Sequence, residues 1–289
     1  MKVERYEATD QNSNLTDYNE IYENFNWDEI EKNFSWSKTN KFNMAYECID
    51  KHVEDGYGDK KAFLYKDGDD TSTYTFKDMK VASNKAANVL KNEAGVEKGD
   101  RVFIFMSRSP ELYFSLLGTL KIGAIVGPLF EAFMEKAVKD RVEDSDAKVI
   151  VTTPELVGRI PVDDLPNLEK VVVVGETDNA DHLDFNAAYE KASEDFEIEW
   201  LDKEDGMILH YTSGSTGQPK GVLHVHYAMV QQYITGKYVL DLKEDDVYWC
   251  TADPGWVTGT SYGIFAPWLN RATNVVVGGR FSPESWYGA

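Results

Sequence analysis

Short apolar runs alternate with longer amphipathic stretches over residues 101–174, and this alternation limits the fold more than any other feature of the sequence. Each apolar run has the length of a buried strand, and the stretches between the runs have the apolar spacing of helices. The predicted strands are 101–105, 124–129, 149–152 and 171–174, and the predicted helices are 110–120 and 132–142. This pattern is typical of βαβ units. We therefore predict an α/β fold with partly parallel sheets and flanking helices on both faces.

The residues just before this region predict a β-hairpin followed by a helix. Residues 62–65 and 71–74 have strand composition and flank the turn sequence 67–70. Thr75 is followed three residues later by Asp78, which is the spacing of a capping box, and the apolar spacing after it is helical. Gly95 is expected to end this helix, because glycine adopts the left-handed conformation found after helix ends.

Residues 1–60 differ from the rest of the chain because they are rich in aromatic and acidic side chains without a regular apolar stripe. We expect short helices here that wrap around the larger body, anchored by Trp27 and Trp36. The sequence thus divides into a helical segment at 1–60 and a larger domain at 61–289.

The last residues indicate an interrupted element. Ser282, Pro283 and Glu284 have the order typical of a helix start, yet only about one turn of sequence follows them. We therefore expect the domain at 61–289 to be partial. We also expect the apolar residues of 247–277 to face water in this chain alone. The alternative is a short natural protein.

Charge, cysteine content and hydropathy exclude several functions. The net charge is −20, which argues against nucleic acid as a partner because phosphate contacts require cations. No apolar run is long enough to span a membrane, and the first ten residues do not resemble a secretory signal. The two cysteines, Cys48 and Cys250, are far apart, so we predict buried reduced thiols and a cytoplasmic location.

The strongest local signal is the sequence YTSGSTGQPKG at residues 211–221. Its three glycines allow consecutive backbone N–H groups to converge, and Lys220 supplies a cation. Four hydroxyls add donors without charge, from Thr212, Ser213, Ser215 and Thr216. Strand-like residues lie on both sides, at 207–209 and 222–225. The segment therefore predicts a loop that holds a polyphosphate.

Two common phosphate loops do not fit this sequence. A P-loop requires lysine directly after its last glycine, whereas Gln218 and Pro219 separate Gly217 from Lys220 here. The glycine spacing also differs from the dinucleotide-binding pattern G-x-G-x-x-G. Walker-type NTPases and Rossmann dehydrogenases are therefore poor matches to this sequence.

Residues 211–221 resemble the signature loop of the adenylate-forming superfamily, and the wider sequence is similar to its AMP-forming acetyl-coenzyme A synthetases. His226 matches a histidine common in that family just beyond the loop, and 253–259 is similar to the next family motif. The resemblance covers nearly the whole chain. It implies that ATP β,γ-phosphates contact Thr212, Ser213, Gly214, Ser215, Thr216, Gly217 and Lys220. It also implies that Trp256, Val257 and Thr258 line the acyl pocket, with Thr258 also near coenzyme A.

One stretch departs from the family pattern. Residues 130–133 are Phe-Glu-Ala-Phe where the synthetases carry Phe-Gly-Gly-Phe near the coenzyme A adenine, so contacts there, and a role for Arg159, do not carry over. His210 and His224 are interpreted as packed or surface residues, because no third ligand stands at zinc spacing.

The resemblance implies an acetate–CoA ligase that uses ATP, Mg²⁺ and coenzyme A. Acetate attacks the α-phosphorus of ATP, pyrophosphate leaves, and the coenzyme A thiol then displaces AMP from acetyl-AMP. No catalytic residue is assigned within this chain, because the family's magnesium glutamate, adenine and ribose motifs and catalytic lysine come later. We expect this chain alone to be inactive, with no metal ligands of its own. The alternatives are a ligase for propionate or another short acyl acid, and a non-catalytic nucleotide-binding module.

Overall fold

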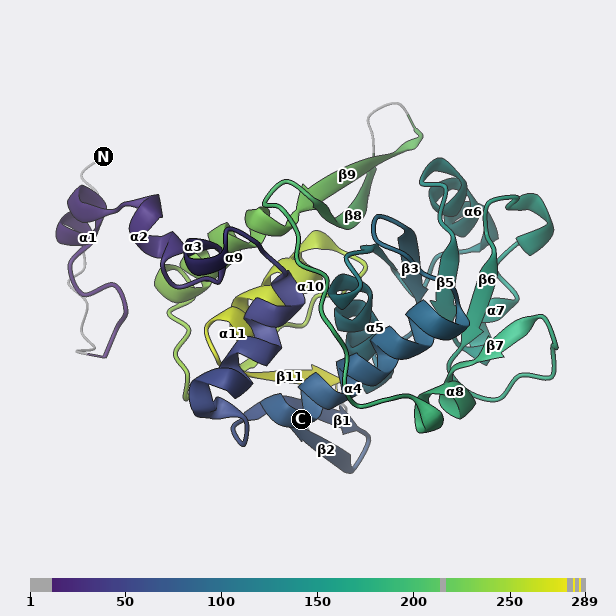
Figure 1. Ribbon diagram of the computed structural model, residues 1–289, viewed down its shortest axis with the longest axis horizontal. Helices are drawn as coiled ribbons and strands as arrows, with labels where there is room; N and C mark the ends of the chain where they lie inside the picture. The colour runs from purple at the N-terminus through teal and green to yellow at the C-terminus, as the bar shows by residue number, and fades with distance from the viewer. Residues whose placement is uncertain (1–11, 214–216, 280–282, 284–285, 287–289) are drawn as a thin grey trace.

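Two β-sheets and the helices around them make up the protein (Figure 1). The computed structural model describes residues 12–213, 217–279, 283 and 286. The larger sheet has seven strands in the order β7-β6-β5-β3-β4-β8-β9, and only the β8–β9 pair is antiparallel. Its strands are β3 (Arg101–Phe105), β4 (Ile125–Leu129), β5 (Val149–Thr152), β6 (Lys170–Val173), β7 (His182–Asp184), β8 (Gly206–Ser213) and β9 (Pro219–Val225).

Helices cover both faces of this sheet, as the alternating pattern predicts. The α-helices are α1 (Tyr18–Asn24), α2 (Trp27–Glu31), α3 (Trp36–Thr39), α4 (Phe76–Asn88), α5 (Pro110–Lys121), α6 (Glu135–Asp144), α7 (Pro154–Val157), α8 (Phe185–Lys191), α9 (Met229–Tyr238), α10 (Val257–Thr260) and α11 (Ala266–Leu269). Short π-helical or 3₁₀ turns are η1 (Tyr46–Asp50), η2 (Val53–Tyr57), η3 (Val89–Glu93), η4 (Val162–Asp164), η5 (His226–Ala228) and η6 (Ser261–Phe265).

Strand β3 shows how both faces are buried. Val102 and Ile104 belong to the core cluster that includes α4 and α5, while Phe103 and Phe105 belong to a second cluster with α6 and α7. Because successive side chains of a strand point to opposite faces, a strand with a core on each side is apolar throughout. The predicted α/β class, with partly parallel sheets between helices, is confirmed.

The smaller sheet has the order β10-β11-β1-β2 and lies below the larger one in Figure 1. Strands β1 (Lys61–Asp67) and β2 (Asp70–Thr75) form the predicted hairpin. Strand β11 (Thr273–Val277) runs parallel to β1 and to β10 (Val247–Trp249).

The pairing of β11 with β1 makes one of our expectations wrong. Ile264, Phe265 and Trp268 are fully buried, and Val276 and Val277 are nearly so, although we expected the apolar residues of this segment to face water. The Trp268 indole donates to the carbonyl of Ala62 at 2.9 Å. The segment therefore packs against strand β1, which lies about 200 residues earlier in the chain.

A local cap sets the start of helix α4, and a contact distant in sequence sets the start of α6. Thr75 and Asp78 form the predicted capping box, and α4 starts at the next residue, Phe76. Helix α6 begins at Glu135, three residues later than predicted, because 130–133 form a turn. The Arg159 guanidinium donates to the carbonyls of Glu131 and Phe133 at 2.9 and 3.2 Å, which holds this turn outside the helix.

The amino-terminal residues are anchored differently from our prediction. Trp27 is 44% exposed, whereas Phe34 and Phe42 are almost completely buried and stack on each other at a centroid distance of 5.7 Å. Trp36 is partly buried against the main core. The anchors are therefore the two phenylalanines, with Trp36 beside them, and Trp27 is not an anchor.

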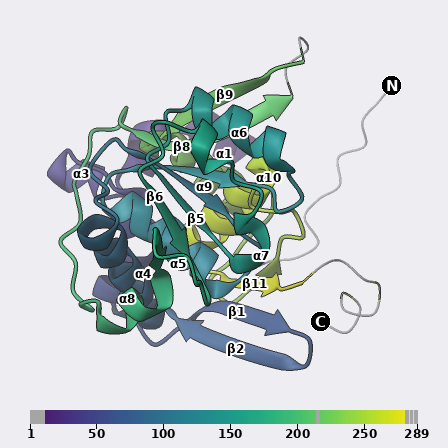
Figure 2. The same ribbon diagram turned by 90° about the vertical axis from the view of Figure 1, so that its right-hand side faces the viewer.

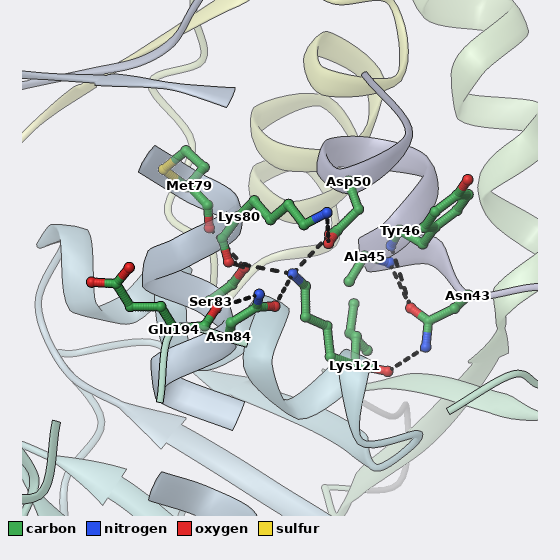
Figure 3. A network of polar contacts seen from close by, with 11 residues as sticks. Asn43, Ala45, Tyr46, Asp50, Met79, Lys80, Ser83, Asn84, Lys121 and Glu194 are labelled. Carbon is green, nitrogen blue, oxygen red and sulfur yellow. Dashed lines mark hydrogen bonds and ion pairs between the residues drawn. The ribbon is translucent and has the colours of Figure 1, made fainter. Parts of the chain in front are cut away.

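A buried ion pair joins η1 to helices α4 and α5 (Figure 3). The Lys121 Nζ lies 2.7 Å from the Asp50 carboxylate and donates to Asn84 Oδ1 at 2.7 Å. Lys121 is fully buried and Asp50 nearly so. Burial lowers the pKa of Lys121, and the Asp50 carboxylate opposes that effect. Charges this deeply buried are tolerated only when they are paired.

Two further observations bear on the sequence-based expectations. Both cysteines are free thiols, with Cys48 buried and Cys250 partly buried. In the part of the chain that the structure describes, none of the helices has the length and apolar character needed to cross a bilayer.

Candidate functional site

The segment predicted to hold phosphate includes the end of β8 and the start of β9, and these two strands form a hairpin that projects from the body in both ribbon views (Figures 1 and 2). Thr212 on β8 is paired with Lys220 on β9, and both residues are exposed. Gly217 has a φ of 87°, a conformation that favours glycine. Gly214, Ser215 and Thr216 lie outside the described residues. Ser213 is the last residue of β8.

The direction of β8 places the end of this strand at one particular edge of the sheet. β8 runs parallel to β4, with Ile208 beside Val126. The carboxyl ends of parallel strands meet at the same edge of a sheet, and this is where α/β proteins bind ligands. The loop therefore begins where β4 also ends.

Tyr211 supports the hairpin just below its tip. Its hydroxyl donates to Asp144 Oδ2 at 2.8 Å, and its ring lies near Phe103 at a centroid distance of 6.4 Å. A Cβ atom at Gly221 would be only 3.3 Å from the Tyr211 ring, so glycine allows β9 to cross this ring closely. The last residues before the loop are thereby tied to α6 and β3.

The second predicted motif packs against the chain immediately after β4. A Cβ atom at Gly255 would be 2.4 Å from the backbone nitrogen of Phe130, and one at Gly259 would be 2.0 Å from the Asp253 carbonyl oxygen. Only glycine fits at such distances. The Gly255 N–H donates to Asp253 Oδ1 at 2.8 Å, and burial raises the pKa of this carboxyl group.

The motif presents its predicted pocket residues to solvent. Trp256 and Val257 are each 49% exposed, and Thr258 is also exposed. The Trp256 ring lies 5.8 Å from Phe130 and 6.5 Å from Phe133, measured between ring centroids. The turn at 130–133, which Arg159 holds, therefore forms an aromatic surface together with Trp256. The stretch 130–133 departs from the family pattern in sequence, but its contact with Trp256 could not be predicted from that departure.

The three histidines near the loop occupy different environments. His226 lies at the base of the hairpin, is completely buried, and accepts the backbone N–H of Met44 at Nδ1 across 3.0 Å. His210 is 5% exposed, and its Nε2 lies 2.8 Å from Thr260 Oγ1. His224 is partly buried. The prediction that His210 is a packed residue is consistent with this burial, but its bond to Thr260 was not foreseen.

The residues described here do not form a metal centre. Within residues 12–213 and 217–279, no group of three His, Cys, Asp or Glu side chains is arranged to hold an ion.

Comparison with known proteins identifies the class to which this fold and loop belong. Residues 50–289 match the family model described as AMP-binding enzyme, and the chain therefore belongs to that family.

Relatives of this chain include acetyl-coenzyme A synthetases. The chain is 63% identical to that of Bacillus subtilis (strain 168), over all of this chain and 51% of the relative. It is 39% identical to that of Rubrobacter xylanophilus, over 83% of this chain and 40% of the relative. The chain thus spans about half the length of the curated relatives it matches, or less.

Solved structures show the same fold. The crystal structure of Brucella canis acyl-CoA synthetase superposes with a TM-score of 0.86 at 28% identity, covering 94% of this chain and 49% of that one. An anthranilate CoA ligase in complex with anthranoyl-AMP superposes with a TM-score of 0.76 at 27% identity. The superposition covers 83% of this chain and 46% of that one.

Proposed function

We propose that this chain is the phosphate-binding and acyl-binding part of an AMP-forming acetate–CoA ligase. The observation that carries the proposal is the position of two motifs at one sheet edge. The hairpin with Lys220 continues from β8, which pairs with β4, and the motif with the exposed wall at 256–258 packs against Phe130 directly after β4. The identity with acetyl-coenzyme A synthetases over the whole chain supports acetate as the acid.

In this proposal the hairpin tip holds the β- and γ-phosphates of ATP. The contacting residues are Thr212, Ser213, Gly214, Ser215, Thr216, Gly217 and Lys220. Trp256, Val257 and Thr258 border the acyl group, and Thr258 also lies near coenzyme A. An acetate oxygen attacks the α-phosphorus and pyrophosphate leaves. The coenzyme A sulfur then attacks the acetyl carbon, the bond from that carbon to the AMP oxygen breaks, and the thiol proton passes to solvent.

Catalysis of this kind requires positioning and charge neutralisation rather than a protein nucleophile. In this proposal magnesium would be held mainly by the phosphates of ATP, where it would neutralise charge. No step assigned to this chain depends on the ion. The reduced state of Cys48 and Cys250 supports a cytoplasmic setting for the reaction.

Isotope exchange tests the proposal. The protein as its gene encodes it should exchange labelled pyrophosphate into ATP only when acetate is present, and it should form AMP once coenzyme A is added. Exchange that does not depend on acetate would contradict the adenylation mechanism, and so would the formation of ADP instead of AMP. Faster exchange with propionate would identify propionate, not acetate, as the substrate, and the adenylation mechanism would still hold. ATP binding without exchange would favour a non-catalytic nucleotide-binding module.

A further inference from the structure

A hydrogen-bond chain connects the strand that carries the phosphate loop to the helix that carries the pocket wall. His210 lies on β8 two residues before Thr212, and Thr260 is the last residue of α10. The atoms His210 Nε2 and Thr260 Oγ1 are 2.8 Å apart, and both side chains are almost completely buried. The bond therefore forms where water does not compete for it.

The direction of this bond follows from the second bond of the threonine. The Thr260 hydroxyl donates its single hydrogen to the carbonyl oxygen of Val257 at 3.1 Å. It must therefore accept from His210, and the imidazole must carry a proton on Nε2. Burial lowers the pKa of His210 to about 4, with His224 acting in the same direction, so the imidazole is neutral at physiological pH.

The bond joins a strand of one sheet to a helix that follows a strand of the other sheet. Strand β8 is part of the seven-stranded sheet, while α10 follows β10 of the four-stranded sheet. Gly255 fixes the start of the pocket motif against Phe130, and Thr260 fixes its end against β8. Val257 lies between these two attachments, and its carbonyl is the last acceptor of the chain.

We propose that His210 is a positioning residue that holds the pocket wall at Val257 in register with the phosphate loop, through Thr260. This inference rests on the proposed function, in which the acid bound at 257–258 attacks a nucleotide whose phosphates are held by the loop. Misplacement of reacting groups by about 1 Å can reduce a rate about 10²-fold. A direct connection between the two half-sites therefore acts on the rate of adenylation.

Four variants test this role. His210→Leu and Thr260→Val each break the bond, whereas His210→Gln and Thr260→Ser each retain a group that can make it. We expect the first two to lower the kcat of acetate-dependent pyrophosphate exchange about 10- to 100-fold, with a smaller change in the KM for ATP. The conservative pair should stay within about threefold of wild type. The double variant His210→Leu/Thr260→Val should be no slower than either single variant. Both substitutions break the same hydrogen bond, so their effects on the rate should not add.

A control and a second measurement separate this proposal from the proposed function. His224→Gln changes the neighbouring imidazole, whose ring centroid is 6.2 Å from that of His210, without touching Thr260, and it should leave exchange unchanged. Independently of any activity, amide hydrogen exchange over 256–261 should accelerate in His210→Leu and not in His210→Gln.

Unchanged amide protection in His210→Leu would overturn the positioning role, even if the wild-type protein catalyses exchange. Equal losses of kcat in His210→Leu and His210→Gln would overturn it as well. A wild-type protein without acetate-dependent exchange would instead reject the proposed function, and the amide measurement would still decide whether the bond fixes α10.

Discussion

The backbone N–H of Met44 donates to Nδ1 of His226 across 3.0 Å, which ties the residues before η1 to the base of the loop hairpin. Because Nδ1 accepts this bond, the neutral imidazole carries its proton on Nε2. His226 is completely buried, and burial lowers its pKa to about 3. Protonation of this ring therefore opposes folding.

The pH dependence of stability should reveal this histidine. Its pKa falls from 6.5 in the unfolded chain to about 3 in the folded protein. The unfolded state therefore binds the proton first as the pH falls below 6.5, and stability is lost. His226→Gln removes the proton that this side chain takes up when the protein unfolds. Between pH 6 and pH 4, urea unfolding should show a slope of free energy against pH that is lower by about 1.4 kcal/mol per pH unit than in wild type.

Glu47 should affect the pH dependence of stability in the direction opposite to His226. It is nearly fully buried, and burial raises its pKa to about 7, from 4.5 in the unfolded chain. The folded protein takes up this proton first, so its contribution to stability increases as the pH falls from 7 to 4.5. Glu47→Gln should therefore steepen the acid-side loss of stability. Equal slopes in wild type and both variants would contradict these assignments.

The buried ion pair predicts a large effect from removing one partner. Lys121→Met leaves the buried Asp50 carboxylate with Lys80, at 3.7 Å, as its one remaining ion-pair partner among the described residues. We expect a loss of about 3–5 kcal/mol in the free energy of unfolding, because a buried charge is left without its main counter-ion. Urea unfolding at neutral pH measures this loss.

Two controls distinguish the desolvated charge from a general packing defect. Lys121→Met/Asp50→Leu removes both charges and should recover much of the stability, since buried pairs can be replaced by apolar residues. Lys41→Met breaks an exposed pair with Asp202 and should cost less than about 1 kcal/mol. A double variant as unstable as Lys121→Met would show that the loss does not come from the unpaired carboxylate.

Most of the fold could be predicted because its elements depend on short-range patterns. The boundaries of β3, the capping box at Thr75 and the hairpin of β1 and β2 follow from local spacing and local hydrogen bonds. The pairing of β11 with β1 could not be predicted in this way. It joins residues about 210 positions apart, such as Phe63 and Asn274, and periodicity carries no information about partners at that distance.

The same limit applies to the candidate site. The glycines, hydroxyls and lysine of the loop are adjacent in sequence, so their chemistry could be inferred before the fold was known. The bond between His210 and Thr260 joins two residues 50 positions apart. Nothing in the sequence around either residue predicts the other as its partner. The start of α6 was missed because Arg159 donates to backbone carbonyls 26 and 28 residues earlier.

Glycine at 255 is predicted to be essential for the pocket motif. Gly255→Ala places a Cβ atom 2.4 Å from the Phe130 nitrogen, so one of the two backbone segments must move. We expect a loss of about 1–3 kcal/mol by thermal or urea unfolding. Gly158→Ala is the matched control, because no atom lies within 4 Å of its Cβ position and its φ is −65°. That change should be neutral or slightly stabilising. Equal behaviour of the two variants would mean that the close approach at Phe130 does not limit the motif.

The last prediction concerns Lys220, the cation of the proposed phosphate site. Lys220→Ala should lower acetate-dependent pyrophosphate exchange about 10²–10³-fold, the effect of removing one electrostatic donor from a transition state. Its side chain is exposed on β9, so the free energy of unfolding should change little. Lys220→Arg keeps the charge and should retain more activity than alanine. Lys136→Ala removes a lysine whose side chain is 78% exposed on α6, and it should have no effect on exchange. Exchange at the wild-type rate in Lys220→Ala would place this lysine outside the phosphate site, even if acetate dependence held.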